Sequence, residues 1–125
     1  MKRILEVEMG ITMALLFLAS LGAYFFYWYS TIWWFDMPMH FAGGYFISIT
    51  LVYMLLKIRK EKPIPAYLKL FLLVFTVGFL WEVYEFAVDA YFNAHMIILM
   101  DSFSDLCFDM AGAITAFFFI DRHML

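Results

Sequence analysis

The sequence has few of the charged residues and cysteines that soluble domains use for surfaces and disulfides. Only 15% of its 125 residues are Asp, Glu, Lys or Arg, and the single cysteine, Cys107, excludes a disulfide within the chain. Hydrophobic residues make up 66% of the chain, against about 45–50% in ordinary soluble domains. The mean hydropathy is +0.87. A soluble chain this short has too much surface to be so apolar, so the composition predicts an integral membrane protein.

Long stretches without charge predict four membrane-spanning helices. No charged residue occurs between Met9 and Phe35, which is longer than the roughly 20 residues that a helix needs to cross a bilayer. Three further apolar stretches follow this first one. The expected spans are residues 9–31, 38–56, 66–92 and 102–120. The sequence therefore predicts an all-α fold, with residues 1–125 forming a single transmembrane domain built as a four-helix bundle.

The basic residues predict the orientation of the four spans. All 8 Lys and Arg residues lie near the N-terminus, in or beside the loop between the second and third spans, or near the C-terminus. Because basic loops stay in the cytoplasm, we expect both termini and this loop there. The loops near residues 32–38 and 93–101 are then expected outside. The protein is predicted to be a multi-pass protein of the cell membrane, in contact with membrane lipids.

Lys and Arg are absent from the outer half of the predicted bundle, whereas acidic residues are concentrated there. Of the 11 Asp and Glu residues, seven lie at the outer ends of the last three spans, and one histidine joins them. Helical spacing places three of the acids on one face of the third span and three in one stripe of the fourth. The set comprises Asp36, His40, Glu82, Glu85, Asp89, Asp101, Asp105 and Asp109.

Acids inside a membrane need a compensating partner. An acidic residue at the centre of a bilayer costs about 2.5–3.5 kcal/mol on the gentler insertion scales. Protonation, a wet cavity or bound cations could offset this cost, and the lack of basic partners favours one or two divalent ions. Oxygen ligands suit Mg²⁺, Mn²⁺ or Ca²⁺, and the added histidine also suits Fe²⁺ or Zn²⁺. The eight residues are thus the predicted metal ligands, with His40 and Glu82 as the predicted general acid or base.

Simpler roles stay open for some of these residues. Asp36 and Asp101 also suit helix N-caps at the membrane surface, and Asp89 also suits a position in the outer water. Small residues let membrane helices approach one another closely. Four glycines extend the polar stripes and predict such contacts between the polar faces: Gly43, Gly44, Gly78 and Gly112.

Three motifs, taken in order, resemble a known family. They are Asp36-x-x-x-His40-Phe41-x-x-Gly44, Trp81-Glu82-x-x-Glu85 and Asp105-x-x-x-Asp109-Met110-x-Gly112-Ala113. This order is similar to the YjdF-like group of small uncharacterised multi-pass membrane proteins and, more distantly, to the VanZ-like proteins. The resemblance implies that the motif positions are occupied by His40, Glu82, Glu85, Asp105 and Asp109. It implies no reaction. Many YjdF-like members have extra spans, so a homo-oligomer is a further expectation.

Three functions are compatible with the sequence. The first is a metal-dependent hydrolase or transferase acting on a lipid-linked phosphate, because divalent ions can clamp a phosphate and activate water. The second is a metal-stabilised structural or sensing module, since metal binding can supply folding energy. The third is a cation or proton transporter subunit, although the polar residues stop half way across the membrane. Nothing indicates nucleic-acid binding, because the membrane topology explains the basic loop.

Overall fold

The computed structural model describes residues 2–59, 67–91 and 99–124, and these residues are almost entirely helical. The elements are α1 (Lys2–Phe26), α2 (Trp28–Thr31), α3 (Asp36–Arg59), α4 (Tyr67–Tyr91) and α5 (Leu99–Met124). No strand occurs among the described residues. All of the helices except α2 are long and apolar enough to cross a membrane. The predicted all-α fold with four spans is confirmed.

The ends of the helices differ from the predicted spans. The first helix ends at Phe26 rather than near residue 31, because Tyr27 takes the left-handed conformation with φ 54° and the chain then turns into α2. Helices α3 and α5 extend past the predicted spans 38–56 and 102–120 at both ends. Asp36 lies in the first turn of α3. Most of the predicted basic loop and much of the loop predicted near residues 93–101 lie outside the described residues.

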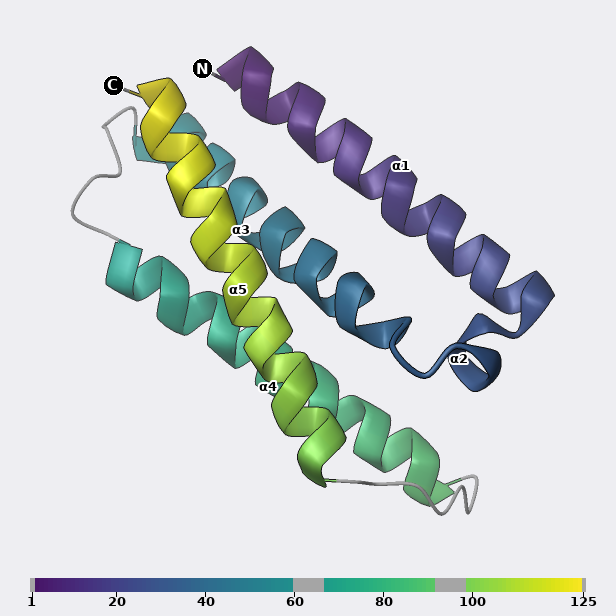
Figure 1. The fold of residues 1–125 in the computed structure, drawn as a ribbon. Helices are drawn as coiled ribbons and strands as arrows, with labels where there is room; N and C mark the ends of the chain where they lie inside the picture. Colours follow the sequence, from purple (N-terminus) through teal and green to yellow (C-terminus); the bar gives the residue numbers. More distant parts are fainter. Residues whose placement is uncertain (1, 60–66, 92–98, 125) are drawn as a thin grey trace.

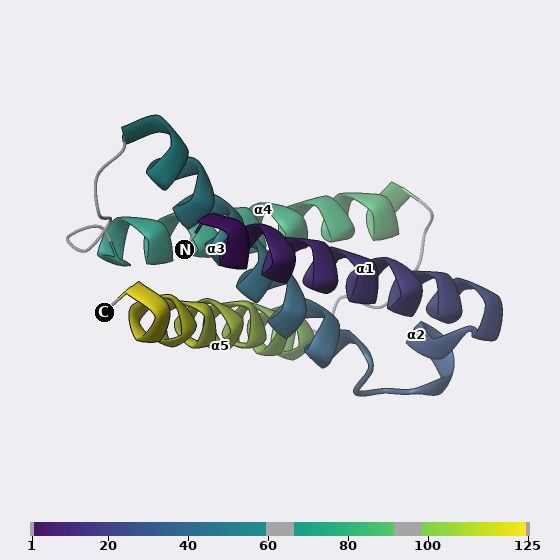
Figure 2. The same cartoon turned by 90° about the horizontal axis from the view of Figure 1, so that it is seen from above.

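Helix α3 is the centre of the bundle. It packs along α5 over most of its length and also contacts α1 and α4, while α4 packs against α5. Figure 1 shows α1 on one side of this group, and Figure 2 shows α3 running obliquely past the other helices. The start of α1 and the end of α5 lie at the same end of the bundle, as four spans require (Figure 1).

The half of the bundle near the termini has an apolar core. Its buried residues are Leu5, Ile49, Val52, Leu56, Leu70, Ala116 and Ile120. In this half three acids are paired with tyrosines: the Tyr53 hydroxyl donates to Glu6 over 2.7 Å, the Tyr45 hydroxyl donates to Glu8 over 3.4 Å, and the Tyr67 hydroxyl donates to Asp121. These bonds join α1 to α3 and α4 to α5. These acids therefore have hydrogen-bonding partners, whereas in the opposite half Oε1 of Glu82 and Oδ1 of Asp105 have none among the described residues.

Two glycines set the distance between α3 and α5. A Cβ atom at Gly44 would overlap the backbone carbonyl of Asp109, and one at Gly112 would overlap the carbonyl of Phe41. The two backbones touch directly at these points, which only glycine permits. The expected contact at Gly43 is wrong, because a Cβ atom there would meet nothing within 4 Å. Of the neighbouring pair, Gly44 faces α5 and is buried.

Candidate functional site

His40 lies at the centre of a group of carboxylates from three helices. Its Nδ1 atom is 3.3 Å from Oδ1 of Asp109. Its Nε2 atom is 3.7 Å from Oδ1 of Asp36, 4.0 Å from Oε1 of Glu82 and 4.0 Å from Oδ2 of Asp105. The His40 residue is only 7% exposed. Both ring nitrogens are therefore surrounded by acidic oxygen atoms in a largely buried site.

The glycine contacts position this group. The approach of α5 to α3 at Gly44 brings Asp109 against the helix that carries His40. On the other side, a Cβ atom at Gly78 of α4 would lie 2.5 Å from Oδ2 of Asp109. Asp109 thus sits in a cradle that two glycines leave open. Asp105 lies one turn earlier on α5, so the same contact carries it towards His40.

Two buried oxygen atoms in the group lack a partner among the described residues. They are Oε1 of Glu82 and Oδ1 of Asp105. The Asp105 side chain is 4% exposed, so its carboxylate has little access to solvent. A buried polar atom left without a partner costs about 1–3 kcal/mol, and more when it is charged. This is the kind of cost that a bound ligand with positive charge removes.

The donor atoms are close enough together to hold a metal ion. One group that could do so is Asp36, His40 and Asp105, and another is His40, Glu82 and Glu85. Within each group the ligand atoms lie within 4.8 Å of one another. Both groups use His40. The prediction that acids from separate helices meet around this histidine agrees with the described geometry, whereas their role as metal ligands stays a prediction.

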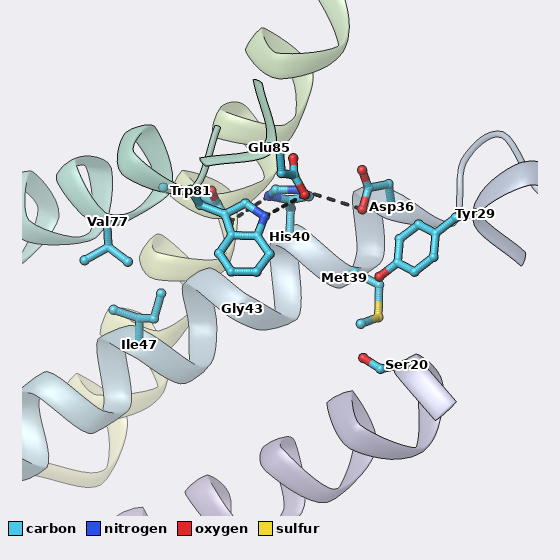
Figure 3. A pocket seen from close by; sticks show the side chains of 12 residues that line it. Ser20, Tyr29, Asp36, Met39, His40, Gly43, Ile47, Val77, Trp81 and Glu85 are labelled. Carbon is cyan, nitrogen blue, oxygen red and sulfur yellow. Dashed lines mark hydrogen bonds and ion pairs between the residues drawn. The ribbon is translucent and has the colours of Figure 1, made fainter. Parts of the chain in front are cut away.

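A cavity of about 330 Å³ opens beside the group. Figure 3 shows its acidic side chains gathered near His40, with Val77 and Ile47 at the apolar end. The indole Nε1 of Trp81 donates a 2.8 Å hydrogen bond to Oε1 of Glu85 at the rim. The cavity is lined by Ser20, Tyr29, Asp36, Met39, His40, Gly43, Ile47, Val77, Gly78, Trp81, Glu85 and Asp109. None of these lining residues is Lys or Arg.

Tyr29 is a wall residue that the sequence did not single out. It lies on α2, among aromatic residues that the sequence alone assigns to the membrane interface. Its position in the wall depends on the break at Tyr27, which no Gly, Asn or Pro marks. Burial and the nearby carboxylates of Asp36 and Glu85 raise the pKa of Tyr29 above its usual value. Its hydroxyl therefore stays protonated at neutral pH and can donate a hydrogen bond.

Two of the predicted ligands stand apart from the group. Asp101, one turn before Asp105, is exposed, and Asp89, one turn after Glu85, is partly exposed. Neither belongs to the sets of donor atoms close enough to hold an ion among the described residues. Glu82 is in the group but is not among the cavity-lining residues, whereas Asp36 and Glu85 are. The metal-binding prediction for Asp89 and Asp101 stays untested.

The fold and the site define a membrane protein with four apolar helices and a buried cluster of carboxylates around one histidine. The chain belongs to the family described as predicted membrane protein (DUF2238), which matches residues 3–124. No curated protein and no solved structure matched the chain. The family description names neither the YjdF-like nor the VanZ-like proteins, so the resemblance to them stays a prediction.

Proposed function

We propose that this protein is a membrane-embedded enzyme that holds a divalent metal ion and acts on a lipid-linked phosphate. The observation that carries the proposal is the environment of His40 Nε2, which has carboxylates from three helices within 4.0 Å. The unpartnered oxygens of Glu82 and Asp105 belong to the same carboxylates. An ion bound there would balance the charge of both carboxylates.

The separation of the donor atoms suits one ion of this kind. A tetrahedral zinc ion with bonds of about 2.0–2.2 Å holds its ligand atoms roughly 3.4 Å apart. The distances of 3.7–4.0 Å from Nε2 to the nearest oxygens of Asp36, Glu82 and Asp105 are only slightly longer than that value. Because one nitrogen ligates one ion, we propose a single ion held by His40, Glu82 and Asp105. Glu82 and Asp105 belong to two different sets of donor atoms that lie within 4.8 Å, so their carboxylates must rotate towards each other when the ion binds. The nitrogen favours Mn²⁺, Fe²⁺ or Zn²⁺ over Mg²⁺ or Ca²⁺.

The remaining polar residues then take different roles from those expected. Asp109 faces Nδ1, so it orients the imidazole in the way that carboxylates support metal-bound histidines. Asp36 lines the cavity, so we assign it the proton transfer that the sequence placed on Glu82. When bound, the metal would polarise the phosphate and activate water or a hydroxyl. It would also carry the charge of the phosphate, for which the described cavity offers no basic side chain.

The first test is the metal content of the purified chain, measured by elemental mass spectrometry after exposure to Mn²⁺, Fe²⁺ or Zn²⁺. We expect about one ion per chain in the wild type, as a single histidine-centred site allows. We expect none in the double variant Glu82→Gln/Asp105→Asn. The matched control, Glu6→Gln/Asp121→Asn, removes two acids at the opposite end and should keep the ion. A wild type that holds no metal and melts identically with and without chelator would overturn the proposal.

Gly78→Ala should weaken metal binding more than it weakens the fold. The new Cβ atom would meet Oδ2 of Asp109 at 2.5 Å and Cδ1 of Leu106 at 3.1 Å, and both atoms belong to side chains that can rotate away. Asp109 would then lose its position against His40, and loss of such support typically costs about 10–100-fold in metal affinity. Titration calorimetry measures the affinity, with Gly10→Ala as the control because nothing lies near Gly10. Unchanged affinity would show that the position of Asp109 does not affect metal binding.

We also propose an orientation of the chain in the membrane, based on its basic residues. The described basic residues lie at the ends of helices in the half opposite the site: Lys2, Arg3, Lys57, Arg59, Lys69 and Arg122. We therefore propose cytoplasmic termini and a site in the outer leaflet. Ion transport has less support, because apolar packing around Ile49 and Val52 fills the described bundle between the site and the termini. A purely structural metal has less support because the cavity adjoins the site.

A further inference from the structure

The outer wall of the cavity combines two carboxylates with two aromatic rings. Trp81 and Glu85 lie one turn apart on α4 and are joined by the 2.8 Å indole hydrogen bond. Tyr29 and Asp36 line the same cavity from α2 and the start of α3. Figure 3 shows the indole and phenol rings on either side of the acidic group. This wall, formed by Tyr29, Asp36, Trp81 and Glu85, contains none of the three proposed metal ligands. Its two carboxylates nevertheless each have an oxygen within 4.8 Å of a His40 ring nitrogen.

The charges around the cavity limit what can bind there. Five carboxylates surround it or lie directly behind it: Asp36, Glu82, Glu85, Asp105 and Asp109. One divalent ion bound to a neutral His40 would balance only two of these charges if all five were ionised. A phosphate then adds further negative charge in a region of low dielectric, where like charges repel strongly. A ligand with a positive group beside its phosphate removes this conflict.

The wall has the chemistry that recognises such a positive group. Aromatic faces attract alkylammonium ions, and a neighbouring carboxylate adds direct charge attraction. Glu85 is suited to this role because its Oε1 is fixed by Trp81 while the carboxylate still faces the cavity. Burial, followed by the charges of Asp36 and Glu85, raises the pKa of Tyr29, so both carboxylates lie near its hydroxyl. The apolar end at Ile47 and Val77 can receive the first part of a lipid chain.

We propose that the cavity binds a lipid whose head group carries an ammonium beside its phosphate, with the ammonium held by Glu85, Trp81 and Tyr29. The phosphate half of this assignment rests on the proposed metal-dependent function, whereas the ammonium half does not. Val77 and Trp81 are 43% and 52% exposed on α4, so the cavity wall reaches the lipid-facing surface. The lipid can thus present its head group while its chains stay in the bilayer.

Native mass spectrometry of the full chain in detergent tests this proposal. The probes are phosphatidylcholine, phosphatidylethanolamine, phosphatidylglycerol and phosphatidic acid with identical acyl chains, each measured with metal and with chelator. We expect the two ammonium lipids to bind about tenfold more tightly than the two anionic ones. Glu85→Gln should abolish this preference. Trp81→Leu should weaken ammonium-lipid binding about three- to thirty-fold, the range of a cation–aromatic contact.

Matched variants separate these effects from general damage. Glu6→Gln removes an acid at the other end, and Trp33→Leu removes a ring that is 81% exposed and does not line the cavity. Both should keep the preference. Equal or tighter binding of the anionic lipids, or a preference that survives Glu85→Gln, would overturn the proposal. If soluble phosphocholine binds as tightly as phosphatidylcholine, the ligand need not be a lipid, and that part of the proposal is wrong. If the elemental analysis finds that the protein binds no metal, the proposed metal function fails. A preference for ammonium lipids that persists in chelator would then leave this inference standing.

Discussion

Gly44→Ala and Gly112→Ala should each prevent the bundle from forming its native α3–α5 contact. The added methyl at residue 44 would overlap the Asp109 carbonyl, and the one at residue 112 would overlap the Phe41 carbonyl and lie 2.8 Å from the Tyr45 nitrogen. All of these are backbone atoms, so no side-chain rotation can relieve the overlap. The helices must separate. We expect a loss of stability at or above the usual overpacking range of about 1–3 kcal/mol.

The measurement is thermal unfolding in detergent, followed by size-exclusion chromatography of the heated sample. Gly43→Ala is the matched control, because it adds the same methyl one residue away, where nothing lies within 4 Å. It should melt like the wild type, or slightly higher since alanine favours helix over glycine. If Gly44→Ala also melts like the wild type, the direct contact between the two backbones does not exist. If Gly43→Ala is the damaging variant, α3 is rotated from its described position.

The contrast between these two glycines shows how far a sequence can define a membrane site. Long uncharged stretches and the acid spacing were enough to predict four helices and to place the acids at one end of the bundle. Side chains at neighbouring helix positions point about 100° apart, so the sequence of a glycine pair does not say which of the two glycines contacts the next helix. Which member faces α5 depends on the packing of both helices. That information is not carried by either helix alone.

The acids show the same limit. Asp101, Asp105 and Asp109 form one stripe on α5, yet only the last two lie within 4.0 Å of His40. The stripe fixes a direction around the helix, but the crossing of α3 decides which turn of α5 meets the histidine. Asp109 also faces Nδ1 and not Nε2, a distinction that spacing cannot make. The sequence thus predicts that these acids gather around His40. The crossing of α3 and α5 determines which acid faces which nitrogen of the imidazole.

Different roles for the two sides of the imidazole lead to the second large expected effect. If Nε2 ligates the ion, His40→Ala removes the only nitrogen ligand of the proposed site. Metal binding should then fall below detection in titration calorimetry. Asp109→Asn keeps an oxygen against Nδ1 but removes the charge that orients and polarises the ring. We expect it to retain the ion with about 10–100-fold lower affinity, as for other residues that support metal-bound histidines.

The order of the two effects is the decisive result. His123→Ala is the matched histidine control, because His123 lies near the end of α5 and its Nδ1 contacts the Phe119 carbonyl. It should bind metal like the wild type. The wild type, His123→Ala and Asp109→Asn should each bind more tightly as pH rises from acid towards neutral, since protons compete with the metal for the ligands. If Asp109→Asn loses the ion as completely as His40→Ala, Asp109 is itself a ligand. The ion then lies on the Nδ1 side, and the carboxylates at Nε2 need another explanation.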